Sequence, residues 1–154
     1  MERPQRSEEL TVATGCEVCG FDLWLPLASL GVSELGLYSD SRFPGRSLLK
    51  LNGHWDSLED LPDDVALEFL SDTRRSMAAI RRATGAERVN FAVLGNAVAH
   101  VHGHLIPRFP ATESKPQSSP WDDPRPRTKL EGAQELELIG RIREELEQRD
   151  GRSE

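Results

Sequence analysis

The chain has 154 residues, which is enough for one domain with a hydrophobic core but short for two. Its formal net charge of −7 argues against a general nucleic-acid binder, because phosphate neutralisation needs a basic surface. No apolar run approaches the roughly 18 residues of a membrane span, and the first ten residues lack the apolar core of a signal peptide. We therefore expect a cytoplasmic protein with neither a membrane nor a nucleic-acid polymer as its partner.

The sequence of the first part of the chain indicates a tail followed by short strands. Residues 1–10 are polar and without a hydrophobic period, so we expect a mobile tail, with the main domain over residues 11–110. Strands are predicted at residues 32–38 and 46–51, because a segment with Asp, Pro and Gly separates two apolar runs.

A long amphipathic helix is predicted over residues 62–82. Apolar side chains recur there at three- and four-residue steps, and Gly85 follows as a stop signal. Two further strands are predicted at residues 88–94 and 100–107. A connection of two to five residues would join them as a hairpin.

The last part of the chain divides into an arm and a helix. Residues 111–128 are rich in proline and serine, so no regular element is expected there. A C-terminal helix is predicted over residues 129–150, with Leu138, Ile142 and Leu146 on one apolar stripe.

The chain has two cysteines, Cys16 and Cys19, too few for a disulfide framework. Their Cys-x-x-Cys spacing is typical of metal-binding sites and of redox-active pairs. The third alternative is that the two cysteines are incidental. A redox pair would be expected where a helix starts at the motif, and no such start is evident in the sequence.

Three of the four histidines of the chain fall within five residues, at His100, His102 and His104. In a strand, residues two apart share a face, so the three imidazoles would project to one side. They could be incidental polar residues, ligands of a metal, or a catalytic set in which one imidazole attacks phosphorus while another handles the proton of the leaving group. The spacing alone leaves these alternatives open.

The segment HVHGHLIPR resembles the signature of the histidine-triad (HIT) family, in which three histidines alternate with apolar residues. The order of the surrounding segments is also similar to that family: YSD, FPG, SLLKL, HWDSLEDL, a long helix and VNFAVLGN. The resemblance covers about residues 16–108. It implies an α+β fold, in which a long helix packs on an antiparallel sheet and a C-terminal helix follows.

The resemblance implies a nucleotide hydrolase that attacks an α-phosphate and forms a nucleotidyl-histidine intermediate. Dinucleoside polyphosphates and nucleoside phosphoramidates are the implied substrates. His102 corresponds to the nucleophile, His104 to the group beside the leaving oxygen, and His100 to a residue that orients the site. Histidine rather than glutamine at the third position favours hydrolysis over nucleotidyl transfer. No organic cofactor is implied, and a homodimer is an expected assembly.

Three residues correspond to substrate contacts in the family. Asp40 resembles an acid that contacts the ribose, and Asn96 takes the place of an amide near the phosphates. Arg46 stands where many members have histidine, and its fork of donors could hold a phosphate. Ala97 lacks the hydroxyl that many members have. These departures keep open an alternative function, a non-catalytic nucleotide-binding or signalling protein of the same fold.

Two other side chains have open interpretations. Arg108 could contact a phosphate or be a plain exposed cation. Trp121, in the arm, could stack on a nucleobase or cap the site, or it could pack the arm onto the domain.

Some relatives within this resemblance bind a structural zinc through a Cys-x-x-Cys pair, a histidine before the long helix, and the first triad histidine. The corresponding residues are Cys16, Cys19, His54 and His100, a closed Cys2His2 set. A further alternative is a zinc-dependent hydrolase that uses the three triad histidines as metal ligands.

Overall fold

The computed structural model describes residues 15–150, with side chains as far as residue 148. The predicted tail at residues 1–10 therefore lies outside the described residues.

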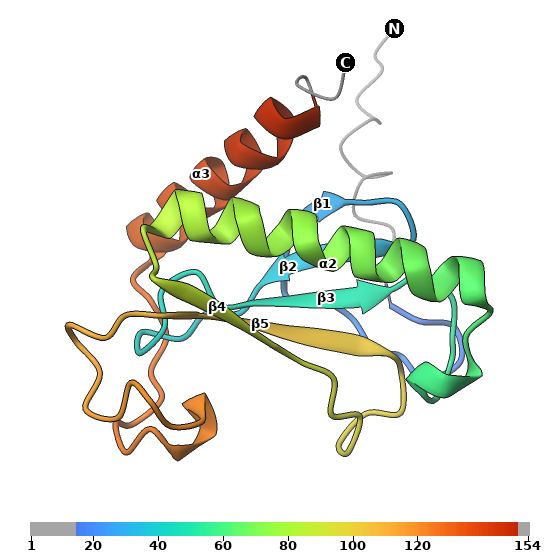
Figure 1. Cartoon of the computed structure of the whole chain (residues 1–154), viewed down its shortest axis with the longest axis horizontal. Coiled ribbons are helices and arrows are strands. Elements are labelled where there is room, and N and C mark those ends of the chain that lie inside the picture. The colour runs from blue at the N-terminus through green and yellow to red at the C-terminus, as the bar shows by residue number, and fades with distance from the viewer. Residues whose placement is uncertain (1–14, 151–154) are drawn as a thin grey trace, which may run out of the picture.

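A single antiparallel sheet forms the centre of the described structure (Figure 1). Its strands follow the order β1-β2-β3-β5-β4, and every neighbouring pair is antiparallel. The strands are β1 (Leu25–Ser29), β2 (Ser33–Leu37), β3 (Ser47–Leu51), β4 (Arg88–Ala92) and β5 (His102–Arg108). This arrangement confirms the α+β fold expected from the sequence.

Two long helices pack on this sheet, one across its face and one at its edge. Helix α2 (Asp63–Thr84) crosses one face, and α3 (Gly132–Asp150) packs against α2 and β1 (Figure 1). Two single-turn 3-10 helices, η1 (Leu58–Asp60) and η2 (Pro120–Asp122), lie in the connections. No helix in the described part of the chain is long and apolar enough to cross a bilayer.

The ends of helix α2 coincide with start and stop signals in its sequence. Pro62 precedes its first turn, which carries Asp63 and Asp64 at the positive end of the helix dipole. Gly85 follows in the left-handed conformation, and its N–H donates to the carbonyl of Arg81. Asp72, on the buried face, accepts hydrogen bonds from the β1–β2 turn at 2.6 to 3.1 Å and so fixes that turn to the helix.

The hydrophobic core lies between α2 and the sheet. Alternate strand residues supply it, among them Leu35, Leu49 and Leu105, which are completely buried, and Phe69 and Ile80 meet them from α2. Burial of each such side chain contributes about 1.5–3 kcal/mol.

The opposite face of the sheet carries two of the three triad histidines. His104 pairs with Leu48 and His102 with Lys50, so their side chains alternate with the core residues and point away from α2. Gly103 lies between them on the core side. A Cβ atom there would meet the ring of Phe91 at 2.4 Å, so glycine makes room for an aromatic ring from β4.

The predicted connection of two to five residues between the last two strands is wrong. Strand β5 begins at His102, and residues 93–101 join it to β4, a longer connection than predicted. The N–H of Val101 donates to the carbonyl of Trp55, and its carbonyl accepts from Leu51. The backbone before His102 therefore binds the turn after β3, and His100, which was predicted to lie in the strand, precedes β5.

Candidate active site and metal centre

The side chain of His102 is oriented by the backbone of His100. Nδ1 of His102 lies 2.6 Å from the backbone oxygen of His100. A carbonyl oxygen can only accept, so Nδ1 carries the proton and donates it in this hydrogen bond. Nε2 of the neutral ring then holds a lone pair, as a nucleophile requires.

His104 lies beside His102, with ring centroids 5.3 Å apart. Its Nδ1 is buried and has no hydrogen-bond partner among the described residues. Burial, together with the positive charge of nearby Arg46, lowers the pKa of His104 to about 4. The ring is therefore neutral at pH 7 in the free protein.

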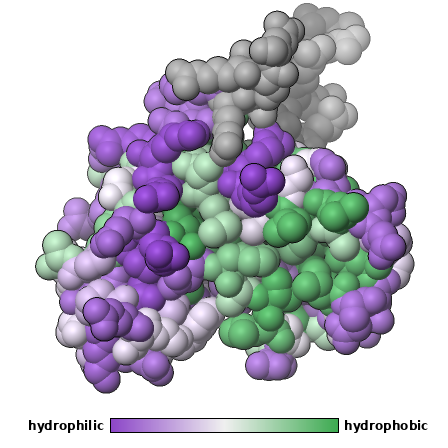
Figure 2. Space-filling view, viewed as in Figure 1, coloured by the Kyte–Doolittle hydropathy of each residue, from purple (hydrophilic) through white to green (hydrophobic). Residues whose placement is uncertain are grey.

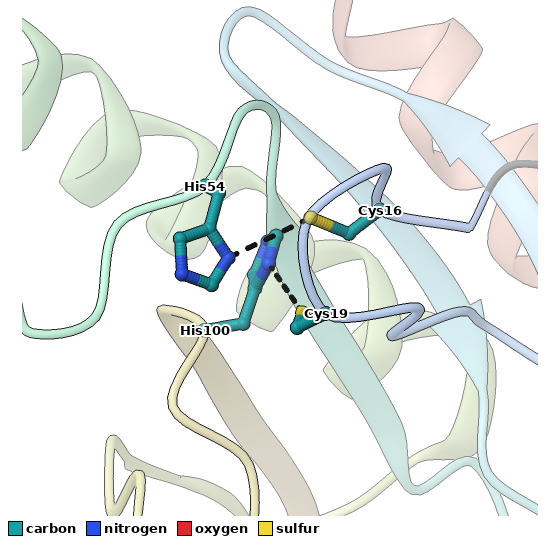
Figure 3. Close-up of side chains that lie close together, drawn as sticks. All are labelled: Cys16, Cys19, His54 and His100. Carbon is teal, nitrogen blue, oxygen red and sulfur yellow. Dashed lines mark hydrogen bonds between the residues drawn. The ribbon is translucent and has the colours of Figure 1, made fainter.

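A second cluster gathers both cysteines and the other two histidines (Figure 3). Sγ of Cys16 lies 3.6 Å from Nδ1 of His54, and Sγ of Cys19 lies 3.5 Å from Nδ1 of His100. A tetrahedral zinc with usual Zn–S and Zn–N bond lengths separates its sulfur and nitrogen ligands by about 3.6 Å. All four ligand atoms lie within 4.8 Å of one another, so the set fits a zinc ion.

Hydrogen bonds hold both histidines of this cluster in the tautomer that a metal needs. Nε2 of His100 donates to the carbonyl of Leu51 at 2.8 Å, and Nε2 of His54 faces Oδ1 of Asp56 at 2.7 Å. The hydrogen bond that Nε2 donates to Asp56 is also the main cause that raises the pKa of His54. Each ring thus turns the lone pair of Nδ1 toward a cysteine, an orientation typical of metal-bound histidine.

The surroundings of Cys16 also favour the form of its side chain that binds a metal. Hydrogen bonds from the backbone N–H groups, chiefly that of Cys19 and also that of Val18, lower the pKa of Cys16 to about 6 against the opposing effect of burial. A zinc ligand must be a thiolate, and these donors favour that form.

Asp40 and Arg46, both predicted substrate contacts, form an ion pair. Asp40 is completely buried, and its carboxylate accepts from Arg42 and Arg46, with the shortest contact to each at 2.9 Å. Burial alone would raise the pKa of Asp40, but the hydrogen bonds from Arg42 and Arg46 outweigh it and hold the pKa below its usual value. The expected ribose contact is thus enclosed by arginines in this structure.

The tight turn after Asp40 explains this pairing. Gly45 has φ of 103°, and a Cβ atom there would lie 2.5 Å from Thr84, so only glycine fits. The turn folds Arg46 back onto Asp40 and places its guanidinium 4.1 Å from the centre of the Tyr38 ring. Arg46 is 6% exposed, and its Nε has no partner among the described residues.

Asn96, the third predicted substrate contact, has no contact with the triad among the described hydrogen bonds. It is exposed in the 93–101 connection, after Gly95, and no hydrogen bond joins it to the triad in the described part of the chain.

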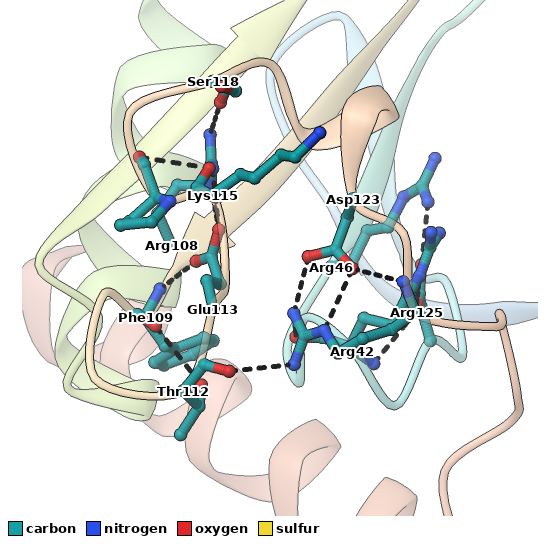
Figure 4. Close-up of polar contacts among 12 residues, drawn as sticks. Arg42, Arg46, Arg108, Phe109, Thr112, Glu113, Lys115, Ser118, Asp123 and Arg125 are labelled. Atoms are coloured by element: carbon teal, nitrogen blue, oxygen red, sulfur yellow. Dashed lines mark hydrogen bonds and ion pairs between the residues drawn. The ribbon is translucent and has the colours of Figure 1, made fainter.

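Arg108 is neither an exposed cation nor positioned to contact phosphate. It is 6% exposed and pairs with Glu113, whose carboxylate also accepts from the N–H of Phe109. It also donates to Oδ1 of Asn90. Its remaining donors reach the backbone carbonyls of Lys115, Pro116 and Ser118, among which Figure 4 labels Lys115 and Ser118. Arg108 therefore fastens the start of the arm to the end of β5.

A second arginine fastens the other end of the arm. Arg125 pairs with Asp123 at 2.8 Å and donates to the carbonyl of Arg42, two residues after Asp40 (Figure 4). Between the two anchors, η2 brings the ring of Trp121 to 5.4 Å from His104, edge to face. The arm thus borders the triad.

Two residues of the site were not found by sequence reasoning. The ring of Phe21, just after the cysteine pair, lies 4.8 Å from His102 and 5.5 Å from His100. Lys50 is 5% exposed and pairs across the sheet with His102. The alternation of Lys50 with Leu49 and Leu51 was the available signal, since it places a lysine on the face opposite the core.

Comparisons with known proteins agree with this geometry. A family model described as HIT domain matches residues 33–111. An uncharacterized HIT-like protein of Methanocaldococcus jannaschii is 27% identical over 73 residues, 44% of this chain. The match spans 56% of the length of that relative.

Solved structures share the fold at low sequence identity. A histidine triad protein from Sinorhizobium meliloti superposes with a TM-score of 0.73 and 23% identity, over 85% of this chain and 99% of that one. A Zn-bound histidine triad family protein from Mycobacterium smegmatis has a TM-score of 0.61 and 20% identity, over 82% and 86% of the two chains.

Proposed function

Because the chain belongs to the histidine-triad (HIT) family, whose members bind nucleotides and include hydrolases, we propose that it hydrolyses a nucleotide at the α-phosphate. The substrate is a dinucleoside polyphosphate or a nucleoside phosphoramidate. His102 is the nucleophile and forms a nucleotidyl-histidine intermediate.

The hydrogen bond between His102 and the His100 carbonyl is the observation that carries this proposal. It leaves Nε2 of His102 free to attack phosphorus. A bond forms between Nε2 and phosphorus as the bond to the leaving group breaks, and its electron pair goes to the leaving atom. Water then attacks the same phosphorus and releases the nucleotide, so that two easier displacements replace a difficult one.

His104 and Arg46 would act beside the leaving atom. His104 adjoins His102 and has an unpaired Nδ1, so it can hydrogen-bond to the departing group. Arg46 supplies a fixed positive charge on the same side of the sheet. Asn96 would need to move toward the phosphates to contribute a hydrogen bond.

We also propose that Cys16, Cys19, His54 and His100 hold a structural zinc ion. The S–N separations, the two oriented histidines and the Zn-bound relative from Mycobacterium smegmatis support this assignment. A closed four-ligand site supplies stability rather than an activated water. His100 would contribute its imidazole to the metal and its carbonyl to His102. A reducing compartment such as the cytoplasm keeps both thiols available, and we place the protein there.

The geometry favours this function over a zinc hydrolase that uses the three triad histidines. The metal-binding set found among the described side chains includes His100 but neither His102 nor His104. A non-catalytic nucleotide binder remains the second candidate, because Ala97 and Arg46 replace residues that many relatives use.

A homodimer is the assembly we propose for this protein. Strand β4 lies at the edge of the sheet, and edge strands are ready to pair. Figure 2 shows hydrophobic side chains gathered on the face that α2 and β4 share, toward the right of the view. The exposed apolar residues are Leu67 and Leu70 on α2, Phe91 on β4, and Leu94 just after β4. A second copy of the chain would cover this apolar area.

Turnover of a nucleotide panel by the wild type and by His102→Asn tests the proposed hydrolase. The asparagine amide can still donate to the His100 carbonyl, so the variant keeps the fold and loses the nucleophile. We expect activity to fall by at least about 10³-fold in the variant. Tight nucleotide binding by the wild type, measured by calorimetry, with no turnover of any compound would support the non-catalytic candidate instead.

A further inference from the structure

Two buried polar atoms of the described side chains lack a hydrogen-bond partner, and both belong to this site. They are Nε of Arg46 and Nδ1 of His104. More than nine in ten buried polar groups in proteins are paired, so such atoms call for an explanation. A bound group that accepts hydrogen bonds would satisfy the N–H of Arg46.

The sheet brings these two residues to the same side. Arg46 precedes Leu48 by two positions, and Leu48 pairs directly with His104 across the sheet. Residues two apart on an extended chain share a face, so Arg46 and His104 both lie on the side away from α2. The charge of Arg46 contributes to the low pKa of His104, which agrees with this proximity.

Surrounding groups hold Arg46 but do not neutralise its charge. NH1 of Arg46 donates to Oδ2 of Asp40 at 2.9 Å, and the guanidinium lies over the Tyr38 ring. Arg42 donates to both oxygens of the same carboxylate. The single carboxylate of Asp40 thus pairs with two guanidinium groups, and these three side chains together keep a net positive charge. Asp40 is therefore a positioning residue for Arg46 in this structure.

A fixed cation beside His104 distinguishes between two kinds of leaving group. When a phosphoric anhydride is cleaved, the P–O bond breaks and the electron pair stays on a phosphate oxygen, which departs as an anion. Arginine stabilises such an anion without a proton transfer. When a phosphoramidate is cleaved, the leaving nitrogen takes the electron pair and must also receive a proton. A buried, neutral imidazole next to a guanidinium is a poor source of that proton.

We propose that Arg46, positioned by Asp40, makes this site selective for nucleotidyl phosphoric anhydrides over nucleoside phosphoramidates. The inference rests on the proposed hydrolase function and narrows its substrate class. The leaving phosphate lies beside the guanidinium of Arg46, next to His104, while His102 attacks from the opposite side of phosphorus.

Two substrates with the same adenylyl group test this selectivity: diadenosine triphosphate and adenosine 5′-phosphoramidate. We expect the wild type to have the larger kcat/KM for the anhydride. Arg46→Gln should lower that value about 10- to 100-fold, in line with the loss of one charged hydrogen bond, and change the phosphoramidate value by less than about threefold. Arg46→Lys should recover part of the loss, because it restores the charge but not the fork of donors.

Asp40→Asn tests the positioning role, and Arg141→Gln is the matched control. The asparagine should lower kcat for the anhydride and leave the phosphoramidate rate nearly unchanged, a difference that general destabilisation would not produce. Arg141 is 58% exposed in its side chain and pairs with Glu137 on the surface of α3, so its loss should affect neither substrate.

Failure of this inference differs from failure of the proposed function. Faster phosphoramidate cleavage by the wild type, or an equal loss on both substrates in Arg46→Gln, overturns the selectivity while an adduct on His102 still supports the hydrolase. Hydrolysis of neither substrate, with no adduct on His102, overturns both.

Discussion

His102 donates a hydrogen bond from Nδ1 to the backbone oxygen of His100 at 2.6 Å, and the imidazole of the same His100 faces Sγ of Cys19 at 3.5 Å. One residue therefore joins the candidate metal centre to the candidate nucleophile. Phe21, which follows the cysteine pair, packs on both rings and reinforces this connection. A metal held by this cluster would therefore fix the residue whose carbonyl orients His102.

Loss of a cysteine ligand should release the metal and destabilise the protein. We expect one zinc per wild-type chain by elemental analysis and very little in Cys16→Ser. A loss of about 3 kcal/mol would lower the Tm by roughly 10 °C for a chain of this size. Val18→Ser, in the same loop and 72% exposed, is the control and should keep its zinc. A natively purified, metal-free wild type whose Tm does not change when zinc is added would contradict the assignment.

The low pKa of His104 predicts a pH dependence of stability. Burial, together with the positive charge of Arg46, lowers this pKa to about 4, below the value of about 6.5 in an unfolded chain. Between these values the unfolded chain binds the additional proton, so the free energy of unfolding should decrease as pH falls from about 6.5 to about 4.

Comparison with His104→Gln isolates this contribution. The part due to His104 should be about 1–2 kcal/mol once its partial exposure to water is considered. Urea unfolding at pH 7.5 and pH 4.5 measures it, because the variant lacks this contribution to the slope. Identical pH dependence in both proteins would show that His104 titrates normally.

Removal of Arg108 should free the arm. Arg108→Ala leaves the carboxylate of Glu113, which has 0% side-chain exposure, buried without its cation. Such a loss costs about 3–5 kcal/mol, and Arg108→Met,Glu113→Gln should recover part of it by removing the unpaired charge. Limited proteolysis should cut the single variant within residues 111–128 and spare the wild type. Unchanged urea stability in Arg108→Ala would contradict the anchoring role.

The exposed apolar area on α2 predicts that the protein is a dimer in solution. Leu67 is 70% exposed and Leu70 52% exposed, and glutamate at both positions would place charge in the proposed contact. Light scattering should give the mass of a dimer for the wild type and of a monomer for Leu67→Glu,Leu70→Glu. Leu136→Glu, on the surface of α3, is the control. A monomeric wild type at tens of micromolar would refute the assembly.

The features that the sequence predicted are those carried by short, local patterns. The α2 helix follows from its apolar period and its terminal Pro62 and Gly85. The ligand set of Cys16, Cys19, His54 and His100 followed from the family resemblance, and the structure brings the four together.

The features that escaped prediction depend on contacts between distant segments. Arg108 is buried because the arm folds back over it, and nothing near it in the sequence indicates this. Asp40 is enclosed because the Gly45 turn returns Arg46 to it. His100 leaves the strand because its neighbour Val101 bonds to the turn at Trp55. Each depends on a tertiary contact that local propensity cannot encode.

Mass spectrometry of the intact protein tests the central claim most directly. The protein is mixed briefly with diadenosine triphosphate or adenosine 5′-phosphoramidate, then denatured at alkaline pH, where a phosphorus–nitrogen bond to histidine survives. We predict one adenylyl group per chain in the wild type, lost on acid treatment and absent from His102→Asn. Turnover without any adduct in the wild type, or an adduct that persists in His102→Asn, would contradict nucleophilic catalysis by His102.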